Sequence, residues 1–241
     1  IDKALHSVES INAIAVTVGP GLIGSLLVGV ETAKTLAYVW KKPIIPVNHL
    51  IGHIYANFIG EISNDSIPNF PSLALIVSGG HTDLVLMKNH GKIKWLGGTR
   101  DDAAGEAFDK IGRLLRLPYP GGPSIEKAAK KGDPKAFNFP RPMIDSDDFD
   151  FSFSGLKTAV LREFKAMKQL NNETIADLAA SVQEAIIDVL VSKTLNAAQK
   201  YKVKSILLGA GVAANEKLRE QFALEIRNLK LEIALSVPPK Y

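Results

Sequence analysis

The sequence predicts an α/β protein, in which strands and helices alternate along the chain. Strand-like apolar runs end in glycine turns, as in INAIAVTVGPG at 11–21 and VKSILLGAG at 203–211. Segments with helical spacing of apolar residues follow those turns. The adjacent runs LALIV and DLVL, joined by SGGHT, add an antiparallel hairpin.

The elements of the first half follow from these signals in order. A strand is expected within 11–21 and a helix from about Leu22 to Trp40. A short strand at 43–47 precedes a second helix, and a polar loop leads to three strands formed by SLALIVS, DLVLM and KIKWLGGT. The segment DDAAGEAFDKIGRLLRL predicts an amphipathic helix over 101–117.

The second half begins with a segment that shows no clear period. Residues 118–155 are rich in Pro, Gly, Phe and Asp, which predicts a long irregular connection of the kind that is usually functional or mobile. Apolar residues at helical spacing then predict a long helix over 174–200. A strand at 203–211, a helix over 212–229 and a last strand at 231–237 complete the order.

Composition limits the class of protein. The 241 residues are 46% apolar, enough for a buried core in one large or two modest domains. The net charge of +4 is compatible with a polyanionic partner without identifying one. The absence of cysteine excludes disulfides and thiolate metal sites in this segment and favours a cytoplasmic location. The most apolar run, GLIGSLLVGV at 21–30, is too short to span a bilayer, and no signal peptide opens the chain.

Both ends predict a segment of a longer protein. Ile1 is not a start residue, and LSVPPKY stops directly after a turn signal.

A histidine pair lies inside the apolar segment PVNHLIGHIYANF at 46–58. His49 and His53 are four residues apart, so a helix places both imidazoles on one face, where they can reach one metal ion. Zinc peptidases use H-E-x-x-H, but no glutamate stands between these histidines. Two hydrogen-bonded surface histidines are the alternative, and no third ligand with fixed spacing is evident.

Two glycine turns are candidate anion sites. The loop at Ser78, Gly79 and Gly80 joins two apolar strands, and its backbone N–H groups are candidates for phosphate binding, although the same turn also makes plain hairpins. The segment at 207–215 is a strand, a glycine turn and a helix start, where Asn215 either binds a nucleotide or caps the helix.

Carboxylates of the helix at 101–117 divide into two kinds. Asp101 and Asp102 stand at its start, where acids favour the helix dipole without any function. Asp109 lies deeper, and it either accepts hydrogen bonds from ribose hydroxyls or pairs with a basic neighbour on the surface. The turn YPGGPS that follows starts a helix carrying Glu126, and its glycines permit a ligand to approach closely or simply form a loop.

Basic residues cluster near 127–141, namely Lys127, Lys130, Lys131, Lys135 and Arg141. A nucleic-acid patch and a solvated helix face are both compatible with them.

Read in order, eight motifs together resemble one family. They are VTVGPGLIGSLLVG, NHLIGH, LIVSGGHTDLVL, DDAAGEAFDKIGRLL, YPGGPSIEK, FPRPM, DFSFSGLKTA and GAGVAAN. The resemblance is to the bacterial tRNA threonylcarbamoyl-transferase subunit family, TsaD, also known as Gcp or O-sialoglycoprotein endopeptidase. It covers the chain from about Ile11 to the last residue.

The resemblance implies the actin/Hsp70/sugar-kinase (ASKHA) fold, in which two related α/β domains flank a nucleotide cleft. The expected domains are 1–100, the remainder of the N-terminal domain without its first strands, and 101–241, the C-terminal domain with an inserted loop at about 118–155 and without its end. The family's helix histidines bind a divalent ion, iron before zinc, together with an Asp from a later CTDN-like segment. His49 and His53 match these ligands, and that segment would start at Tyr241.

Substrate contacts are carried over residue by residue. Ile76, Val77, Ser78, Gly79 and Gly80 match the family's phosphate and acyl-adenylate loop. Asp109 and Gly122 match positions on the ribose and adenine side, with Glu126 one helical turn on. Asn215 matches the asparagine of the family's GGVAAN motif, from which Gly209-Ala210-Gly211 is a slight departure.

The implied reaction transfers the threonylcarbamoyl group from threonylcarbamoyl-AMP to N6 of the adenine next to the anticodon, in tRNAs reading codons that begin with A. The cleft ligand is threonylcarbamoyl-AMP, ATP or AMP. The implied partners are tRNA, a paralogous TsaB-like subunit and a small TsaE-like ATPase, with no membrane. The rival interpretations are a metallo-glycoprotease and a non-catalytic ATP-binding scaffold of the same complex.

Overall fold

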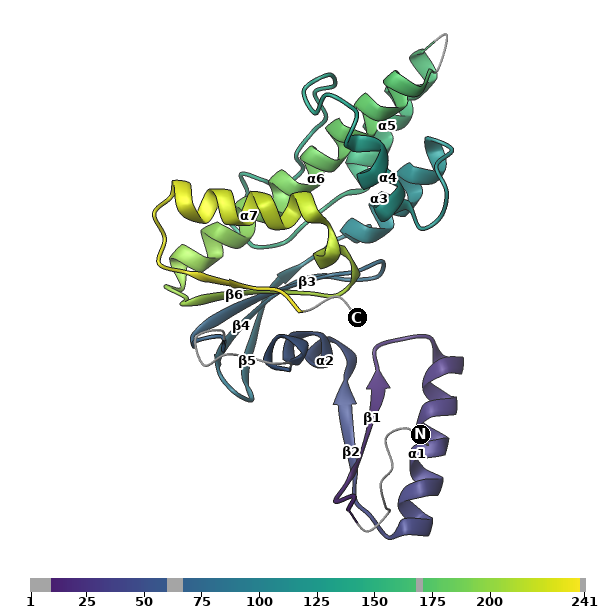
Figure 1. Cartoon of the computed structure of the whole chain (residues 1–241), viewed down its shortest axis with the longest axis vertical. Coiled ribbons are helices and arrows are strands. Elements are labelled where there is room, and N and C mark those ends of the chain that lie inside the picture. The colour runs from purple at the N-terminus through teal and green to yellow at the C-terminus, as the bar shows by residue number, and fades with distance from the viewer. Residues whose placement is uncertain (1–9, 60–66, 168–170, 239–241) are drawn as a thin grey trace. The chain divides into compact units, whose positions relative to one another are not determined.

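The computed structural model describes residues 10–59, 67–167 and 171–238. The chain forms two compact units, Ile1–Tyr55 and Ala56–Tyr241, and each is described by itself (Figure 1). The domains that the resemblance implies divide at residue 100, and this division stays a prediction. The units divide earlier because the three strands within 72–98 share one sheet with the strands that follow residue 200.

The first unit is a β-α-β arrangement followed by a short helix. Strands β1 (Ile14–Gly19) and β2 (Ile44–Asn48) are parallel and are joined by helix α1 (Ile23–Trp40). Helix α2 (His49–Tyr55) follows β2 directly. The predictions of a strand within 11–21, a helix at 22–40 and a strand at 43–47 are confirmed to within one or two residues.

A mixed five-stranded sheet organises the second unit, in the order β5-β4-β3-β6-β7. Its strands are β3 (Ser72–Val77), β4 (Thr82–Asn89), β5 (Lys92–Gly98), β6 (Ser205–Gly209) and β7 (Ala234–Ser236). β4 is antiparallel to both β3 and β5, whereas β6 is parallel to β3 and β7. β3 and β6 are buried along their whole length, as expected for near-continuous apolar runs at the centre of a sheet.

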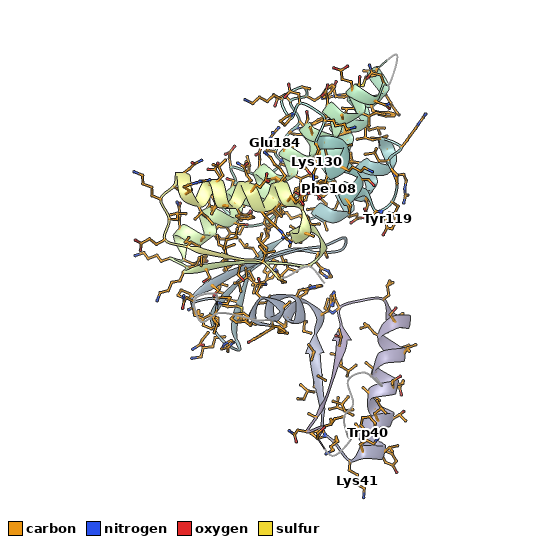
Figure 2. The ribbon with its side chains drawn as sticks, in the orientation of Figure 1. Trp40, Lys41, Phe108, Tyr119, Lys130 and Glu184 are labelled. Carbon is orange, nitrogen blue, oxygen red and sulfur yellow. The ribbon has the colours of Figure 1, made fainter. Side chains whose placement is uncertain are left out.

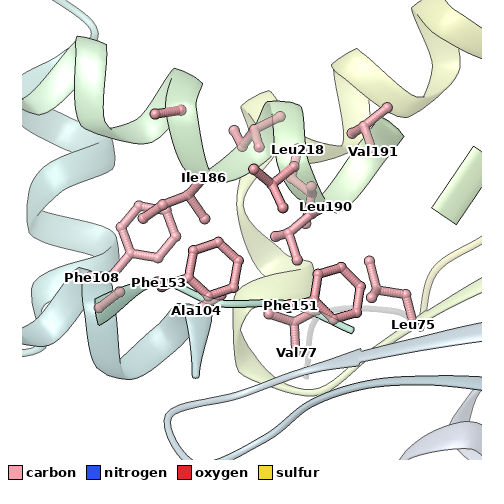
Figure 3. Packing of buried hydrophobic residues seen from close by; sticks show 14 of the residues in the cluster. Leu75, Val77, Ala104, Phe108, Phe151, Phe153, Ile186, Leu190, Val191 and Leu218 are labelled. Carbon is pink, nitrogen blue, oxygen red and sulfur yellow. The ribbon is translucent and has the colours of Figure 1, made fainter. Parts of the chain in front are cut away.

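Helices supply the other layer of this unit, and Figure 1 shows α6 and α7 lying along one face of the sheet. They are α3 (Ala104–Leu114), α4 (Gly121–Ala129), α5 (Ser154–Ala166), α6 (Asn172–Lys200) and α7 (Glu216–Asn228), with 3-10 turns η1 (Ala56–Phe58) and η3 (Gly211–Ala214). Leu75 and Val77 of β3 belong to one buried cluster with Ile186 and Leu190 of α6 (Figure 3). None of the described helices combines the length and the apolar character needed to cross a membrane.

The connection predicted at 118–155 contains helix α4, and its remainder is tied to the core by a buried lysine. Lys193 of α6 is only 2% exposed. Its ammonium group donates to Met143 O at 2.8 Å and to Ser146 Oγ at 2.7 Å. Burial lowers the pKa of Lys193, against the opposing effect of Asp148. These bonds satisfy the buried charge and hold the irregular chain on α6.

Helix α5 has no counterpart among the predicted elements, and its N-terminus explains why. Its N-cap residue, Phe153, offers no side-chain cap. The cap comes from Asp101, which accepts hydrogen bonds from Phe153 N at 2.8 Å and Ser154 N at 3.2 Å. The hydroxyls of Ser152 and Ser154 donate to the same carboxylate at 2.5 and 2.7 Å. Asp101 therefore caps a helix about fifty positions later in the chain and not its own.

We expect Asp101→Ala to lower the free energy of unfolding by about 1–2 kcal/mol, the usual effect of losing an N-cap. Burial alone would raise the pKa of Asp101, but the hydrogen bonds from Ser152, Ser154 and Phe153 outweigh it and lower the pKa below 3.8. The stabilisation is therefore complete above pH 3.8 and is lost as the pH falls through the lower, folded-state pKa.

Urea unfolding at pH 7 and at pH 3 measures this effect. The matched control is Asp147→Ala, which removes an exposed carboxylate that accepts no hydrogen bond from a described group. Equal losses for Asp101→Ala and Asp147→Ala at pH 7 would contradict the capping role.

A strained residue follows strand β6. Ala210 has φ 69° and ψ −175°, a conformation that is essentially restricted to glycine. Holding a residue with a Cβ there costs on the order of 1–3 kcal/mol. The strain at Ala210 therefore raises the free energy of the folded state, and a glycine at position 210 would remove that strain.

We expect Ala210→Gly to raise the free energy of unfolding by about 1 kcal/mol, because relief of strain exceeds the ~0.4–1 kcal/mol that glycine costs through the unfolded state. Differential scanning calorimetry should show a Tm about 2–4 °C higher. Ala213→Gly is the control, since Ala213 is buried in a helical turn and has no strain to relieve. A fall in Tm for both variants would show that Ala210 is not strained.

Candidate nucleotide pocket and histidine pair

One cavity of about 260 Å³ in the second unit gathers residues from four separate parts of the chain. Five of the predicted substrate residues line it, namely Gly79, Asp109, Gly122, Glu126 and Asn215. The other lining residues are Gly105, Phe108, Pro120, Pro123, Gly211, Val212 and Ala214. The volume suits a nucleoside-sized ligand, although it lies just below the ~300–1,000 Å³ usual for ligand sites.

The loop after β3 is held against the start of α3 by backbone contact. Gly105 N donates to Ser78 O at 3.1 Å. A Cβ on Gly105 would lie 2.4 Å from Ser78 O, so only glycine permits this approach. Thr82 Oγ1 accepts from Ala104 N at 2.9 Å and caps the same helix end. These two hydrogen bonds attach the turn to the start of α3.

Within that loop the N–H groups have different roles. Ser78 N donates to His81 O at 2.8 Å, and Gly80 N donates to Ser78 Oγ at 3.2 Å. Gly79 N donates to no acceptor among the described residues. Ile76 and Val77 are buried in β3 and do not line the cavity. Gly79 is thus the loop residue placed to contact a ligand, and its neighbours position it.

Asp109 joins α3 to the start of α4. Its Oδ1 accepts a hydrogen bond from Gly121 N at 2.7 Å. A Cβ on Gly121 would lie 2.5 Å from both Asp109 Cα and Phe108 O, so this contact also requires glycine. The hydrogen bond uses one carboxylate oxygen, which leaves the other oxygen for a ligand in the cavity.

Asn215 and Glu126 also have structural roles. Asn215 Oδ1 caps α7 by accepting from Leu218 N at 2.9 Å, and its amide nitrogen donates to Gln183 Oε1 at 3.0 Å. Glu126 Oε1 accepts from Glu216 N at 2.7 Å. Both residues line the cavity while they fix the start of α7.

The N-termini of two helices lie at this cavity, whose lining also holds the carboxylates of Asp109 and Glu126. Gly105 is the second residue of α3, and Gly122 is the second residue of α4. The dipoles at such helix ends favour anions, although Gly105 N and Gly121 N already donate to Ser78 O and Asp109 Oδ1. Phe108 and Val212 add apolar surface to the wall. The cavity therefore combines two helix N-termini with apolar contacts suited to a planar base.

The pocket residues that sequence reasoning missed are mostly glycines and small apolar residues, such as Gly105, Gly211 and Ala214. Their signal in the sequence is weak, because a glycine near a helix start is compatible with many turns. The AAGEAFD segment offered one clue, since a glycine inside the first turn of a helix lowers helix stability unless close packing requires it.

The histidine pair lies on α2 in the first unit. Asn48 Oδ1 caps this helix, accepting from Leu50 N at 2.9 Å and Ile51 N at 3.3 Å. The Nε2 atoms of His49 and His53 are 3.1 Å apart. This is a hydrogen-bond distance between the two rings. Two nitrogens bound to one ion at ~2.1 Å lie about 3.0–3.4 Å apart for angles between 90° and 109°, so the distance agrees with both a hydrogen-bonded pair and a shared metal ion. The described residues hold no cluster of three or more potential metal ligands.

The basic cluster at 127–141 is partly neutralised. Lys130 pairs with Glu216 at 2.9 Å, and Arg141 pairs with Asp188 at 2.8 Å. Figure 2 shows Lys130 near the middle of the helical layer. These ion pairs favour the solvated helix face over a nucleic-acid patch.

Curated relatives match almost the whole chain. The tRNA N6-adenosine threonylcarbamoyltransferase of Symbiobacterium thermophilum is 53% identical, over 93% of this chain and 65% of its own length. The enzyme of the same name from Moorella thermoacetica is 52% identical, over 96% of this chain and 66% of its own length. The chain therefore spans just under two thirds of the length of these two relatives.

Solved structures show a shared fold at low identity. HypF of T. kodakarensis superimposes with a TM-score of 0.66 at 13% identity, over 94% of this chain and 37% of that protein. Full-length HypF in its phosphate- and nucleotide-bound form gives a TM-score of 0.65 at 9% identity, over 94% of this chain and 43% of that protein.

The model of one family matches residues 1–241 and is described as TsaD, tRNA N6-adenosine threonylcarbamoyltransferase. Together with relatives that are more than 50% identical, this match identifies the chain as a member of the TsaD family.

Proposed function

We propose that the protein transfers the threonylcarbamoyl group from threonylcarbamoyl-AMP to N6 of the adenine next to the anticodon, in tRNAs reading codons that begin with A. The observation that carries the proposal is the convergence of Gly79, Asp109, Gly122, Glu126 and Asn215 on one cavity that also holds two helix N-termini. Family membership supplies the reaction class. We place this reaction in the cytoplasm, with a TsaB-like subunit and a TsaE-like ATPase as partners.

In the proposed reaction the lone pair of the adenine N6 attacks the carbamoyl carbon. The bond between that carbon and the phosphate oxygen breaks, and AMP leaves with the electron pair. N6 loses one proton to the phosphate or to water. No described side chain is assigned as general base.

The residues of the chain bind and orient the acyl-adenylate. The N–H of Gly79 donates to a phosphate or carbamoyl oxygen, since it has no acceptor among the described residues. Asp109 accepts from the ribose hydroxyls through the oxygen that Gly121 leaves free. Phe108 and Val212 pack against the base. Fixing the electrophile in this way removes much of the entropic cost of the reaction.

His49 and His53 hold a divalent metal ion in this proposal, with iron preferred over zinc. The ion would supply Lewis-acid polarisation of an acyl oxygen. Two imidazole nitrogens would fill only part of the coordination shell, so the ion would need further ligands from outside α2. A peptidase would need a carboxylate to activate water, and Leu50, Ile51 and Gly52 supply none between the histidines.

The fold class implied by the resemblance is also part of the proposal. We infer that the two units are parts of the two related α/β domains of an ASKHA fold. The shared sheet of β3 and β6 supports a boundary nearer residue 56 than residue 100.

Asp109→Asn tests the ribose contact. The variant keeps an oxygen that can accept from Gly121 N but loses the charge. We expect the Kd for AMP to rise about 10-fold, since hydrogen bonds to charged groups contribute ~1.5–3 kcal/mol. Isothermal titration calorimetry measures the change. Glu106→Gln, on the same helix but outside the cavity, is the control. An unchanged Kd for AMP in Asp109→Asn would show that Asp109 does not contact the ligand.

His49→Ala tests the metal and the reaction together. With full-length protein, partner subunits, tRNA and threonylcarbamoyl-AMP, we expect wild type to form N6-threonylcarbamoyladenosine, detected by mass spectrometry of digested tRNA. The variant should lose at least ~100-fold in activity, an effect typical of losing electrostatic stabilisation of the transition state. Its bound metal, measured by elemental analysis, should fall in parallel, as it should in His53→Ala.

Three outcomes distinguish the rival functions. Absence of product from a folded, metal-loaded wild-type complex would reject the transferase. Full activity in a metal-free His49→Ala protein would reject the metal role. Intact partner binding together with unchanged acyl transfer in His49→Ala would favour the scaffold.

A further inference from the structure

Beside the nucleotide pocket, the turn between α3 and α4 presents two arginines and a tyrosine to solvent. Arg113 and Arg116 are exposed, and Tyr119 is 81% exposed. Figure 2 shows Tyr119 at the outer side of the helical layer. We call these three residues the α3–α4 rim. Tyr119 directly precedes Pro120, which lines the cavity, so the rim adjoins the pocket mouth.

The rim is held rigidly relative to the pocket. Arg116 has φ 57°, and its N–H donates to Arg113 O at 3.1 Å. Leu117 N donates to Gly112 O at 2.9 Å. A Cβ on Gly112 would lie 2.9 Å from Gly121 Cα, which shows how closely the two ends of the turn approach. The backbone of the turn is therefore held close to the start of α4, which lines the cavity.

The charge of the rim is not neutralised by its surroundings. Neither Arg113 nor Arg116 forms an ion pair with a described carboxylate, whereas Lys110 on the same helix pairs with Asp102 and Glu106. Lys130, on the next helix, is also paired. Two unpaired guanidinium groups beside an exposed aromatic ring are suited to a polyanion with accessible planar groups.

Single-stranded RNA has this chemistry. Proteins recognise unpaired loops by stacking splayed bases on aromatic rings and by contacting phosphates with arginine. In the proposed reaction, the adenine N6 must reach an acyl group held in the cavity, so the neighbouring nucleotides of its loop must lie against the cavity's surroundings. Pro120 joins the wall of that cavity to Tyr119, which makes the rim one of the surfaces nearest to the incoming loop.

We propose that the α3–α4 rim docks the anticodon loop of the tRNA, with Tyr119 stacking on an unpaired base and Arg113 and Arg116 contacting phosphates. This inference rests on the proposed function, because it assigns a surface to the RNA substrate of that reaction.

The test uses the full-length protein with its partner subunits and an anticodon stem-loop RNA. The variants are Tyr119→Ala, Tyr119→Phe and Arg116→Gln. Arg227→Gln is the charge-matched control, because Arg227 is an exposed arginine in the last turn of α7 and does not line the cavity. For each protein we measure the Kd of the RNA at several salt concentrations, the KM for tRNA, and the Kd for AMP.

We expect Tyr119→Ala to raise the Kd of the RNA and the KM for tRNA about 10-fold, as for loss of one base–aromatic stack. Tyr119→Phe should stay within about 2-fold of wild type, because it keeps the ring. Arg116→Gln should weaken binding and reduce the slope of log K against log salt by ~0.7, as for one phosphate of a single strand. The Kd for AMP should be unchanged in all of them.

The remaining outcomes overturn the inference in distinguishable ways. If wild type modifies tRNA but the rim variants behave like Arg227→Gln, the proposed function stands and the rim is not an RNA surface. If wild type forms no product, the proposed reaction is rejected. The Kd of the RNA in the rim variants, compared with wild type and Arg227→Gln, still shows whether the rim binds RNA. A parallel loss of AMP affinity would show that the rim acts by shaping the pocket. Weakened binding of a partner subunit with unchanged RNA affinity would assign the rim to a protein.

Discussion

The candidate site depends on close contact between backbones on both sides of α3. Gly105 meets the carbonyl of Ser78, and Gly121 meets the backbone of Phe108 and Asp109, at distances that leave no room for a Cβ. These two contacts bring the loop after β3 and the start of α4 to one helix. Because that helix carries Asp109, the carboxylate and both glycine turns reach the same cavity. Substituting either glycine would displace a whole turn and not only a side chain.

Elements with strong local periodicity could be predicted from the sequence, and elements that depend on distant partners could not. The apolar runs of β3 and β6 and the spacing along α6 are local signals, and the structure confirms them. Helix α5 takes its N-terminal cap from Asp101, because its own N-cap residue, Phe153, has no capping side chain. In the sequence, Asp101 has the position of an ordinary acid at the start of the helix predicted over 101–117. A long-range cap thus accounts for both the missed helix and the misassigned aspartate.

At the candidate site, five of the nine substrate residues implied by the motifs line one cavity, but their structural roles could not be predicted from the sequence. Asn215 left two interpretations open, a helix cap and a nucleotide contact. The structure gives it the cap and the Gln183 hydrogen bond, and also a place in the cavity wall. Asp109 similarly joins Gly121 and lines the cavity. The two roles are compatible, since a side chain that is fixed by the fold presents its remaining atoms to a ligand with little loss of entropy.

The histidine pair shows the limit of spacing as evidence. An i,i+4 separation puts two imidazoles on one helical face, where their side-chain conformations bring the Nε2 atoms to 3.1 Å from each other. Asn48 caps the first turn of the same helix through the N–H groups of Leu50 and Ile51. Spacing says nothing about a third ligand, because ligands from other elements meet the pair only through tertiary structure. A pair arranged in this way lowers the ordering cost of binding a metal ion, and the choice of metal then depends on the ligands that complete the shell.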